Sequence, residues 1–198
     1  LEPLSKEKPK SAVILCHGYG GDGKDISILA NYWKAHLPET IFICPDAPEK
    51  CAASPTGYQW FDLIDQTPEQ VLSKSLVAES KLNKLIDEVK DKNNLLANQI
   101  IIGGFSQGCM ISLQTGVKRK DTINSIIGYS GRIIDTDHLR KNIISKPNII
   151  LMHGDIDQIV PVNSLLEAKD FFNKNNYKIE SRIFDNCEHR IPTEGSSL

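Results

Sequence analysis

The sequence predicts an α/β fold in which helices cover both faces of a central, mostly parallel β-sheet. Short apolar runs recur along the chain without the polar alternation of half-exposed strands, which is typical of strands buried on both faces. Amphipathic helical patterns lie between these runs, and strands that alternate with helices form parallel sheets. Because crossovers between parallel strands are right-handed, we expect helices on both faces of the sheet.

The expected strands are continuous apolar runs, except for the last one, which alternates. Most of the runs are followed by glycine or proline, which interrupt regular structure. The alternation of the last run indicates a strand nearer an edge of the sheet. The expected strands span residues 12–16, 41–44, 100–102, 123–129, 148–152 and 178–184.

The expected helices lie between these strands, and the longest of them has a clear start signal. Thr67 and Gln70 form a capping-box pattern, and Pro68 stands at the first helical position, where its missing N–H costs nothing. The expected helices span residues 25–37, 68–89, 106–117 and 162–172. In the first helix, the stripe expected to face the core consists of Ile28, Leu29, Tyr32, Trp33 and Leu37.

Length and composition exclude several classes of protein. A chain of 198 residues predicts a single domain spanning residues 1–198. The net charge of −2 argues against nucleic acid as a partner, since such binders usually carry a basic face. No apolar run approaches the ~20 residues of a transmembrane helix, so no transmembrane segment is expected. No pattern in the sequence predicts an oligomeric state.

The cysteines and the termini bear on location and completeness. The five cysteines are odd in number and none pairs at a CxxC spacing, which is atypical of a disulfide scaffold. Residues 1–10 are polar and lysine-rich and do not resemble a signal peptide. We therefore expect free thiols and a cytoplasmic protein. The chain begins without Met and stops abruptly at Leu198, so we expect truncated termini.

The most informative motif is Gly104-Phe105-Ser106-Gln107-Gly108, a G-x-S-x-G pattern between an expected strand and an expected amphipathic helix. This motif requires a strand–turn–helix context, because the serine hydroxyl must project from a sharp, strained turn. Gly104 and Gly108 lie where a Cβ atom would collide as strand and helix pack together. Ser106 is therefore the candidate nucleophile; the alternative is a helix N-cap.

A serine nucleophile needs a base, and in this fold the partners follow in the order Ser, acid, His. Of the five histidines, only His189 follows an acid that lies beyond a later strand. Asp155 and Asp157 both follow the fifth strand. We favour Asp157 as the catalytic acid because it stands deeper in the loop, whereas Asp155 suits a hydrogen bond to loop backbone.

The developing oxyanion also needs donors. One candidate is the backbone N–H of Gln107, directly after the nucleophile. The other is the N–H of Tyr19, because the surrounding glycines let the loop of residues 17–21 turn an N–H inward. The alternative interpretation of this loop, a nucleotide-phosphate site, lacks the GxGxxG and GxxxxGK[ST] spacings.

A metal site is the remaining alternative for the strand ends. His17 and His153 each follow an expected strand and could converge there. The sequence has no HxxxH pattern and no cysteine-rich cluster, so we favour rings that hold loop backbone over metal ligands. The sequence therefore predicts no metal and no cofactor.

Together these motifs resemble the carboxylesterase/phospholipase family of α/β-hydrolases, which includes acyl-protein thioesterases and small bacterial carboxylesterases. The resemblance covers residues 8–194. It implies a catalytic triad of Ser106, Asp157 and His189, oxyanion donors Tyr19 and Gln107, and an acyl pocket beside Trp60 and Phe61. The segments that carry it are Leu15-Cys16-His17-Gly18-Tyr19-Gly20, Gly57-Tyr58-Gln59-Trp60-Phe61-Asp62, Gly103-Gly104-Phe105-Ser106-Gln107-Gly108, His153-Gly154-Asp155-Ile156-Asp157, Val160-Pro161 and Glu188-His189.

The resemblance implies an α/β-hydrolase fold without a large cap domain and a serine hydrolase that cleaves small acyl esters or thioesters through an acyl-enzyme. A lipidated protein is one substrate that it allows. The alternatives are a lysophospholipase or peptidase-like hydrolase with the same triad, and a non-catalytic binding domain. The chain departs from the family at Asn186 and Cys187, where a glycine is usual, and in the short segment 190–198, where the family has a full helix.

Overall fold

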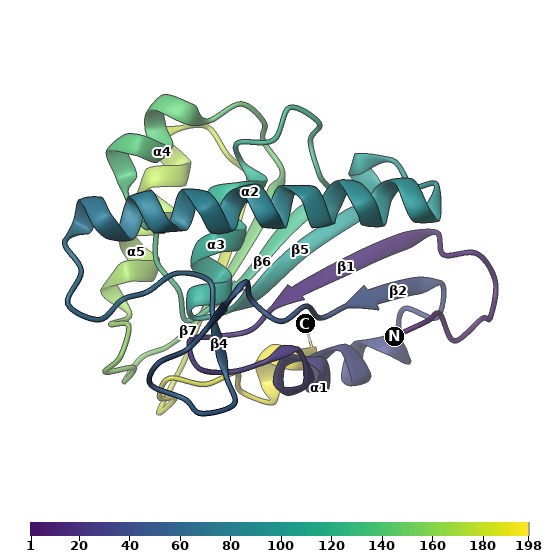
Figure 1. Cartoon of the computed structure of the whole chain (residues 1–198), viewed down its shortest axis with the longest axis horizontal. Helices are drawn as coiled ribbons and strands as arrows, with labels where there is room; N and C mark the ends of the chain where they lie inside the picture. Colours follow the sequence, from purple (N-terminus) through teal and green to yellow (C-terminus); the bar gives the residue numbers. More distant parts are fainter. Residues whose placement is uncertain (198) are drawn as a thin grey trace.

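The computed structural model describes residues 1–197 and is built around a six-stranded sheet with strand order β2-β1-β5-β6-β7-β8 (Figure 1). Every neighbouring pair of these strands is parallel, which confirms the predicted sheet, and the alternating last strand lies at an edge. The strands are β1 (Ser11–Cys16), β2 (Thr40–Ile43), β5 (Ile100–Phe105), β6 (Ser125–Tyr129), β7 (Asn148–Gly154) and β8 (Ile179–Phe184).

Helices cover both faces of the sheet, as predicted. Figure 1 shows α1 on the opposite side of the sheet from α2 and α3. The larger hydrophobic core lies between the sheet and α2, α3 and α5, and a smaller core lies under α1. The helices matching the predictions are α1 (Gly23–Lys34), α2 (Pro68–Asn93), α3 (Gln107–Gly116) and α5 (Asn163–Lys174). The capping box predicted at Thr67 and Gln70 is present.

Three short helices were not predicted. They are α4 (Thr136–Asn142) and 3-10 helices at Ala97–Gln99 and Glu194–Ser197. The sequence of α4 is polar and charged, and only Leu139 is buried in it, so it has no apolar periodicity to detect. Its start is stabilised instead by Asp135, whose carboxylate accepts the N–H of His138.

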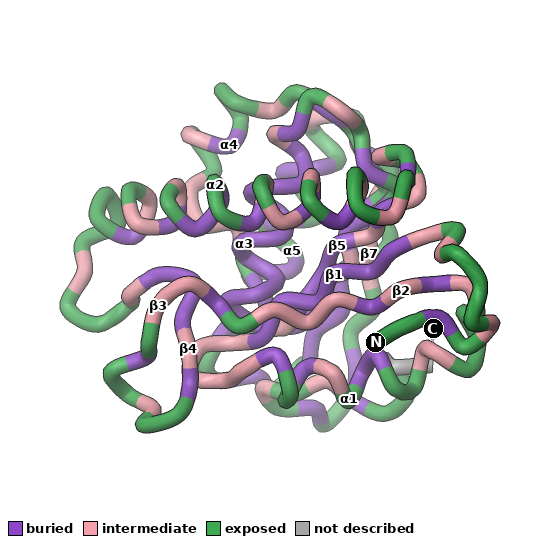
Figure 2. Tube along the Cα trace, turned by 45° about the vertical axis from the view of Figure 1, so that its right-hand side comes forward, coloured by how far each residue is buried: buried purple, intermediate pink, exposed green. Residues whose placement is uncertain are grey.

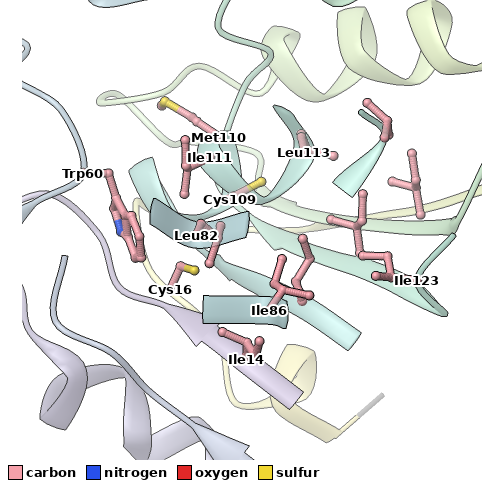
Figure 3. Packing of buried hydrophobic residues seen from close by; sticks show 14 of the residues in the cluster. Ile14, Cys16, Trp60, Leu82, Ile86, Cys109, Met110, Ile111, Leu113 and Ile123 are labelled. Carbon is pink, nitrogen blue, oxygen red and sulfur yellow. The ribbon is translucent and has the colours of Figure 1, made fainter. Parts of the chain in front are cut away.

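Strand β1 shows how the sheet separates the two cores. Ala12, Ile14 and Cys16 face the larger core, while Val13 and Leu15 face the smaller one. Figure 2 shows the buried trace concentrated in the central strands, and Figure 3 shows Ile14 and Cys16 packed with α2 side chains. The continuous apolar run therefore reflects burial on both faces, as the sequence indicated.

The predicted core stripe of α1 is partly wrong: Leu29 and Trp33 pack in or against the smaller core as expected, but Ile28 and Tyr32 do not. Ile28 and Tyr32 are each 61% exposed, whereas Ile26, Leu29 and Ala30 face the core. The start of the helix lies tightly against the backbone that follows β2, since a Cβ atom on Gly23 would come within 2.1 Å of the Cys44 carbonyl oxygen.

Helix α3 was expected to be amphipathic, but all of its residues are buried. It lies between the sheet and α2, so neither of its faces reaches solvent (Figure 1). A helix that is enclosed in this way is strongly held along its length, and its first residue follows Ser106 directly. The enclosure thus supports the turn that carries the candidate nucleophile.

The long segment between β2 and α2 contains a short antiparallel hairpin, β3 (Glu49–Lys50) and β4 (Tyr58–Gln59). The hairpin attaches to the glycine-rich loop after β1: Gly20 N–H donates to the Tyr58 carbonyl at 2.9 Å, and Tyr58 N–H donates to the Gly21 carbonyl at 2.8 Å. A Cβ atom on Gly57 would come within 1.9 Å of the Gly20 carbonyl oxygen. The two loops therefore form one unit at the edge of the sheet where the strands end.

Residues 1–197 also bear on the state of the cysteines, on membrane-spanning helices and on a cap domain. All five cysteines are free, as expected. None of the helices in this part of the chain is long and apolar enough to cross a membrane. No separate cap domain covers the sheet within these residues.

Candidate active site

Ser106 lies in the sharp turn between β5 and α3, with backbone angles φ 53° and ψ −116°. A non-glycine residue rarely adopts this conformation, so the turn is strained in the way the motif requires. Although Ser106 occupies the N-cap position of α3, its side chain makes no capping hydrogen bond. Its Oγ instead lies 3.0 Å from Nε2 of His189. The N-cap alternative is therefore wrong.

The glycines of the motif allow this turn to pack against β1. A Cβ atom on Gly104 would come within 2.2 Å of the Cys16 carbonyl oxygen, and one on Gly108 within 2.0 Å of the same atom. Both distances are far shorter than a van der Waals contact. The contacted atom belongs to the backbone, which cannot move easily to make room. Glycine at both positions thus lets the start of α3 approach the end of β1.

His189 connects Ser106 to a buried carboxylate. Its Nδ1 lies 2.7 Å from Oδ2 of Asp157, whose side chain has no exposed surface. The other oxygen, Oδ1, accepts the N–H groups of Ile159 and Val160, each at 2.9 Å. Burial alone would raise the pKa of Asp157, but the hydrogen bonds from His189, Val160 and Ile159 outweigh it and hold the pKa below its usual value. Asp157 is therefore an ionised, fully satisfied partner for His189.

Asp155 has a different place in the structure. It is exposed, and its Oδ1 accepts the N–H of Cys187 at 3.1 Å. Asn186 adopts the left-handed conformation with φ 53°, which asparagine tolerates well. A Cβ atom on Gly154 would come within 2.0 Å of the Cys187 carbonyl oxygen, so the two loops touch closely. Asp155 thus anchors the turn that precedes His189, in line with the backbone role expected for it.

The two expected oxyanion donors flank Ser106. The N–H of Gln107 is at the start of α3, where the helix dipole favours negative charge. The loop carrying Tyr19 is adjacent, since a Cβ atom on Gly18 would lie 3.4 Å from Cβ of Ser106. Within residues 1–197, neither N–H donates to a protein acceptor. Both groups therefore remain candidates for hydrogen bonds to a bound carbonyl oxygen.

The structure does not place Trp60 and Phe61 in an open acyl pocket. Trp60 is 3% exposed and Phe61 is fully buried, because both side chains belong to the larger core. Figure 3 shows Trp60 packed there. Their backbone groups hydrogen-bond to the side chain of Gln107 instead. The expectation that Trp60 and Phe61 line an acyl pocket is therefore corrected: both side chains are buried in the core and do not line a groove that solvent reaches.

His17 and His153 hydrogen-bond to loop backbone, the role that the sequence favoured. Nε2 of His17 accepts the N–H of Ala47 at 2.9 Å, and Nε2 of His153 donates to the Val160 carbonyl at 2.7 Å. Burial lowers the pKa of both rings, which keeps them neutral. Among the residues that the structure describes, no group of three or more His, Cys, Asp or Glu side chains could hold a metal ion.

The glycine-rich loop after β1 is also unsuited to phosphate. Its N–H groups at Gly20 and Gly21 donate to the carbonyls of Tyr58 and Gly18, so they do not point together into an anion site. This pairing agrees with the absence of nucleotide-binding spacings from the loop sequence.

A groove of about 530 Å³ runs between α1 and the segment after His189. Its walls include Ile28 and Tyr32, the α1 side chains that the core leaves exposed, together with Phe105, whose ring lies 4.7 Å from that of His189. Ser106 does not line this groove. The groove therefore adjoins the triad residues on the His189 side without containing the candidate nucleophile.

The sequence analysis missed exposed apolar side chains in the loops that carry the site. Ile156 and Ile159 flank Asp157, and they are 47% and 73% exposed. Leu63 and Ile64 follow Phe61 closely and are also exposed. The available signal was the pairing of large apolar residues in short loop segments beside the expected site, since binding residues are often carried on loops.

Comparisons with known proteins agree with this geometry. A family model described as Phospholipase/Carboxylesterase matches residues 4–196. Acyl-protein thioesterase 1 of Saccharomyces cerevisiae is 31% identical over 216 aligned positions, which cover 100% of this chain and 94% of that protein. The chain is also similar to the crystal structure of esterase PE8, with a TM-score of 0.94, 33% identity and coverage of 100% of this chain and 92% of that one.

A more distant structure shares the fold. The Bacillus cereus carboxylesterase aligns with a TM-score of 0.79 at 15% identity, covering 99% of this chain and 87% of that one. The family model matches nearly the whole chain, and these structures share its fold. The chain belongs to the phospholipase/carboxylesterase family of α/β-hydrolases and is an enzyme of the serine hydrolase class.

Proposed function

We propose that this enzyme hydrolyses carboxylic esters and thioesters through an acyl-enzyme formed on Ser106, with His189 as general base and Asp157 as the residue that orients it. The observation that carries the proposal is the position of His189, which lies 3.0 Å from Ser106 Oγ and 2.7 Å from Asp157 Oδ2. Because Asp157 is an acceptor only, the proton of the neutral imidazole resides on Nδ1. Nε2 then presents its lone pair to the serine hydroxyl.

In the first half of the reaction, Ser106 Oγ bonds to the substrate carbonyl carbon while His189 Nε2 accepts the hydroxyl proton. The carbonyl oxygen becomes an oxyanion and accepts hydrogen bonds from the N–H groups of Tyr19 and Gln107. When the carbonyl re-forms, the bond to the leaving oxygen or sulfur breaks, and His189 protonates that atom. Water then attacks the acyl-enzyme by the same steps and releases the acid. No cofactor or metal ion is needed for this chemistry.

The loops beside the site support an acyl group as the part of the substrate that is recognised. Ile156 and Ile159 on one loop and Leu63 and Ile64 on the other are exposed, and such side chains lose water favourably when they contact an alkyl chain. The similarity to acyl-protein thioesterases leads us to include lipidated proteins among the proposed substrates. The free cysteines agree with the reducing, cytoplasmic location that we also propose.

Replacement of the nucleophile tests the proposal. Ser106→Ala should abolish hydrolysis of p-nitrophenyl butyrate and of butyryl thioesters, and should prevent mass addition by a fluorophosphonate probe. Ser73→Ala, on the exposed side of α2, is the matched control and should leave both unchanged. Hydrolysis by Ser106→Ala at the wild-type rate would refute the assignment.

A substrate series separates this function from its alternatives. Oxyesters and thioesters of increasing acyl length should be turned over, whereas peptide amides should not. Preference for lysophospholipids over all simple esters would indicate a lysophospholipase. A protein that neither turns over any ester nor reacts with the fluorophosphonate would be a non-catalytic binding domain.

A further inference from the structure

The two candidate oxyanion donors belong to segments far apart in the chain, and buried hydrogen bonds through Trp60 connect them. We propose that Trp60 and the side chain of Gln107 are positioning residues that align the N–H groups of Tyr19 and Gln107 for the transition state. The inference rests on the proposed function and assigns roles that this function does not itself require.

The side chain of Gln107 holds one donor. It is completely buried, its Oε1 accepts the Trp60 N–H at 2.8 Å, and its Nε2 donates to the Phe61 carbonyl at 2.6 Å. This residue is the first of α3, so the same residue carries the N–H aimed at the oxyanion and the amide that is fastened to the 60–61 backbone. Fastening both atoms of the amide restricts rotation of the start of the helix relative to that segment.

The indole of Trp60 reaches the loop of the other donor. Its Nε1 donates to the His17 carbonyl at 3.1 Å, and the two rings lie 5.9 Å apart. His17 is in turn held by the Ala47 N–H, which donates to Nε2 at 2.9 Å. Because Nε2 is the acceptor, Nδ1 carries the proton and donates to the Gly18 carbonyl at 2.7 Å.

This last hydrogen bond determines the direction of the Tyr19 N–H. The Gly18 carbonyl and the Tyr19 N–H belong to the same planar trans peptide, so they point in opposite directions. The Gly18 carbonyl accepts both from His17 and from the Gly21 N–H, the latter at 3.1 Å. Holding that oxygen on one side therefore holds the N–H on the other. Trp60 thus links the peptide that carries one donor to the residue that carries the second.

Oxyanion stabilisation is sensitive to such alignment. Removal of one donor costs on the order of 10²- to 10³-fold in kcat, because the donors must be positioned before charge develops. A small displacement of either N–H should lose part of this factor. It should not weaken ground-state binding, since the oxyanion is absent from the bound substrate.

Variants that remove the hydrogen bonds but keep side-chain volume test the inference. Trp60→Phe removes the indole N–H, and Gln107→Met removes both amide contacts. Each should lower kcat by about tenfold to 100-fold and leave KM within about twofold. Affinity for a trifluoromethyl ketone, which forms a tetrahedral oxyanion on serine, should fall by the same factor as kcat. The pH dependence of kcat should keep its shape, because His189 and Asp157 are untouched.

Gln114→Met is the matched control. Gln114 is also a buried glutamine on α3, but its amide donates to Ser75 at 3.1 Å and to Glu79 at 2.9 Å, away from the reaction centre. We expect this variant to lose thermal stability as Gln107→Met does, with kcat unchanged. A loss of kcat in the control that matches the loss of stability would mean that stability, not alignment, explains the effect.

The double variant tests whether the bonds act together. The double variant, Trp60→Phe with Gln107→Met, should have a kcat no more than about threefold below that of the less active single variant. The reason is that the effects of contacts in one network are not additive. If the losses of kcat in the two single variants multiply in the double variant, the two residues act independently, and the inference of a shared network is overturned. If Gln107→Met does not fold, Trp60→Phe decides alone, and a kcat within twofold of wild type overturns the inference. Failure of the proposed function is distinguished by an active Ser106→Ala.

Discussion

Nδ1 of His189 lies 2.7 Å from Oδ2 of Asp157, although the two residues follow different strands of the sheet. Asp157 follows β7 and His189 follows β8, so the parallel pairing of these two edge-side strands brings the residues together. The carboxylate has no exposed surface and receives further hydrogen bonds from its own loop. The position of the imidazole therefore depends on two loops that the sheet aligns.

Asp157→Asn should lower kcat about 10³- to 10⁴-fold, because an amide that donates to the imidazole favours the wrong tautomer. The measurement is kcat for p-nitrophenyl butyrate at neutral pH, with protein folding checked by circular dichroism.

Asp155→Asn is the control for that change. The amide oxygen that this substitution introduces would still accept the Cys187 N–H, so kcat should stay within about threefold of wild type. If Asp155→Asn rather than Asp157→Asn produced the large loss, the catalytic acid would have to be reassigned.

Gly108→Ala should destabilise the fold by about 3 kcal/mol or more, because the new Cβ atom would come within 2.0 Å of the Cys16 carbonyl oxygen. Urea denaturation measures the change in the free energy of unfolding. Gly21→Ala is the matched substitution, since its Cβ atom would make its nearest contact with the Asp25 carboxylate, a flexible group, at 3.3 Å. Equal losses in both variants would argue against tight packing of α3 on β1.

Ile159→Ser should reduce selectivity for longer acyl chains. The side chain is 73% exposed in the loop that carries Asp157, and contact with an alkyl chain would bury part of it. A loss of about 1 kcal/mol of such contact predicts a roughly fivefold fall in kcat/KM for an octanoyl ester relative to an acetyl ester. Leu96→Ser, at a 68% exposed residue before β5, should leave this ratio unchanged. An unaltered ratio in Ile159→Ser would exclude this side chain from acyl recognition.

Stability should fall as the pH decreases below about 6.5, the usual pKa of histidine. Burial lowers the pKa of His153, so in this range the unfolded chain binds a proton that the folded protein does not. The free energy of unfolding then decreases from about pH 6.5 down to the lowered pKa of the folded state. Thermal melts between about pH 7.5 and 5 measure this slope, which His153→Gln should reduce but not remove, because burial also lowers the pKa of His17. His36→Gln, at an exposed histidine, should leave the slope unaltered.

Local sequence predicted the parts of the site that depend on short stretches of chain. The G-x-S-x-G motif between a strand and a helix predicted the strained turn at Ser106, because glycine placement and strand–turn–helix order are local properties. The order of Ser106, Asp157 and His189 along the chain, each after a buried strand, also predicted contacts that the structure contains. Parallel strands bring their ends to one edge, so sequence order was sufficient.

Roles that depend on packing could not be predicted in this way. On α1, Leu29 of the expected stripe is buried, whereas Ile28 and Tyr32 are exposed and line the groove beside His189 instead. Trp60 and Phe61 were expected at an acyl pocket, yet they are buried and hydrogen-bond through their backbone to Gln107. A hydrophobicity pattern shows that a side chain seeks apolar contact, but it does not specify which contact.

The sequence by itself determined the parallel α/β sheet, the turn at Ser106 and the chemical types of residue that follow the strands. Only the tertiary structure decided which faces of the helices are buried, that Asp155 bonds the Cys187 N–H in particular, and that Trp60 lies between the two candidate oxyanion donors. The physical reason is distance along the chain. Periodicity and turn chemistry act over a few residues, whereas these contacts join segments more than 30 residues apart, and their geometry follows from how the whole core packs.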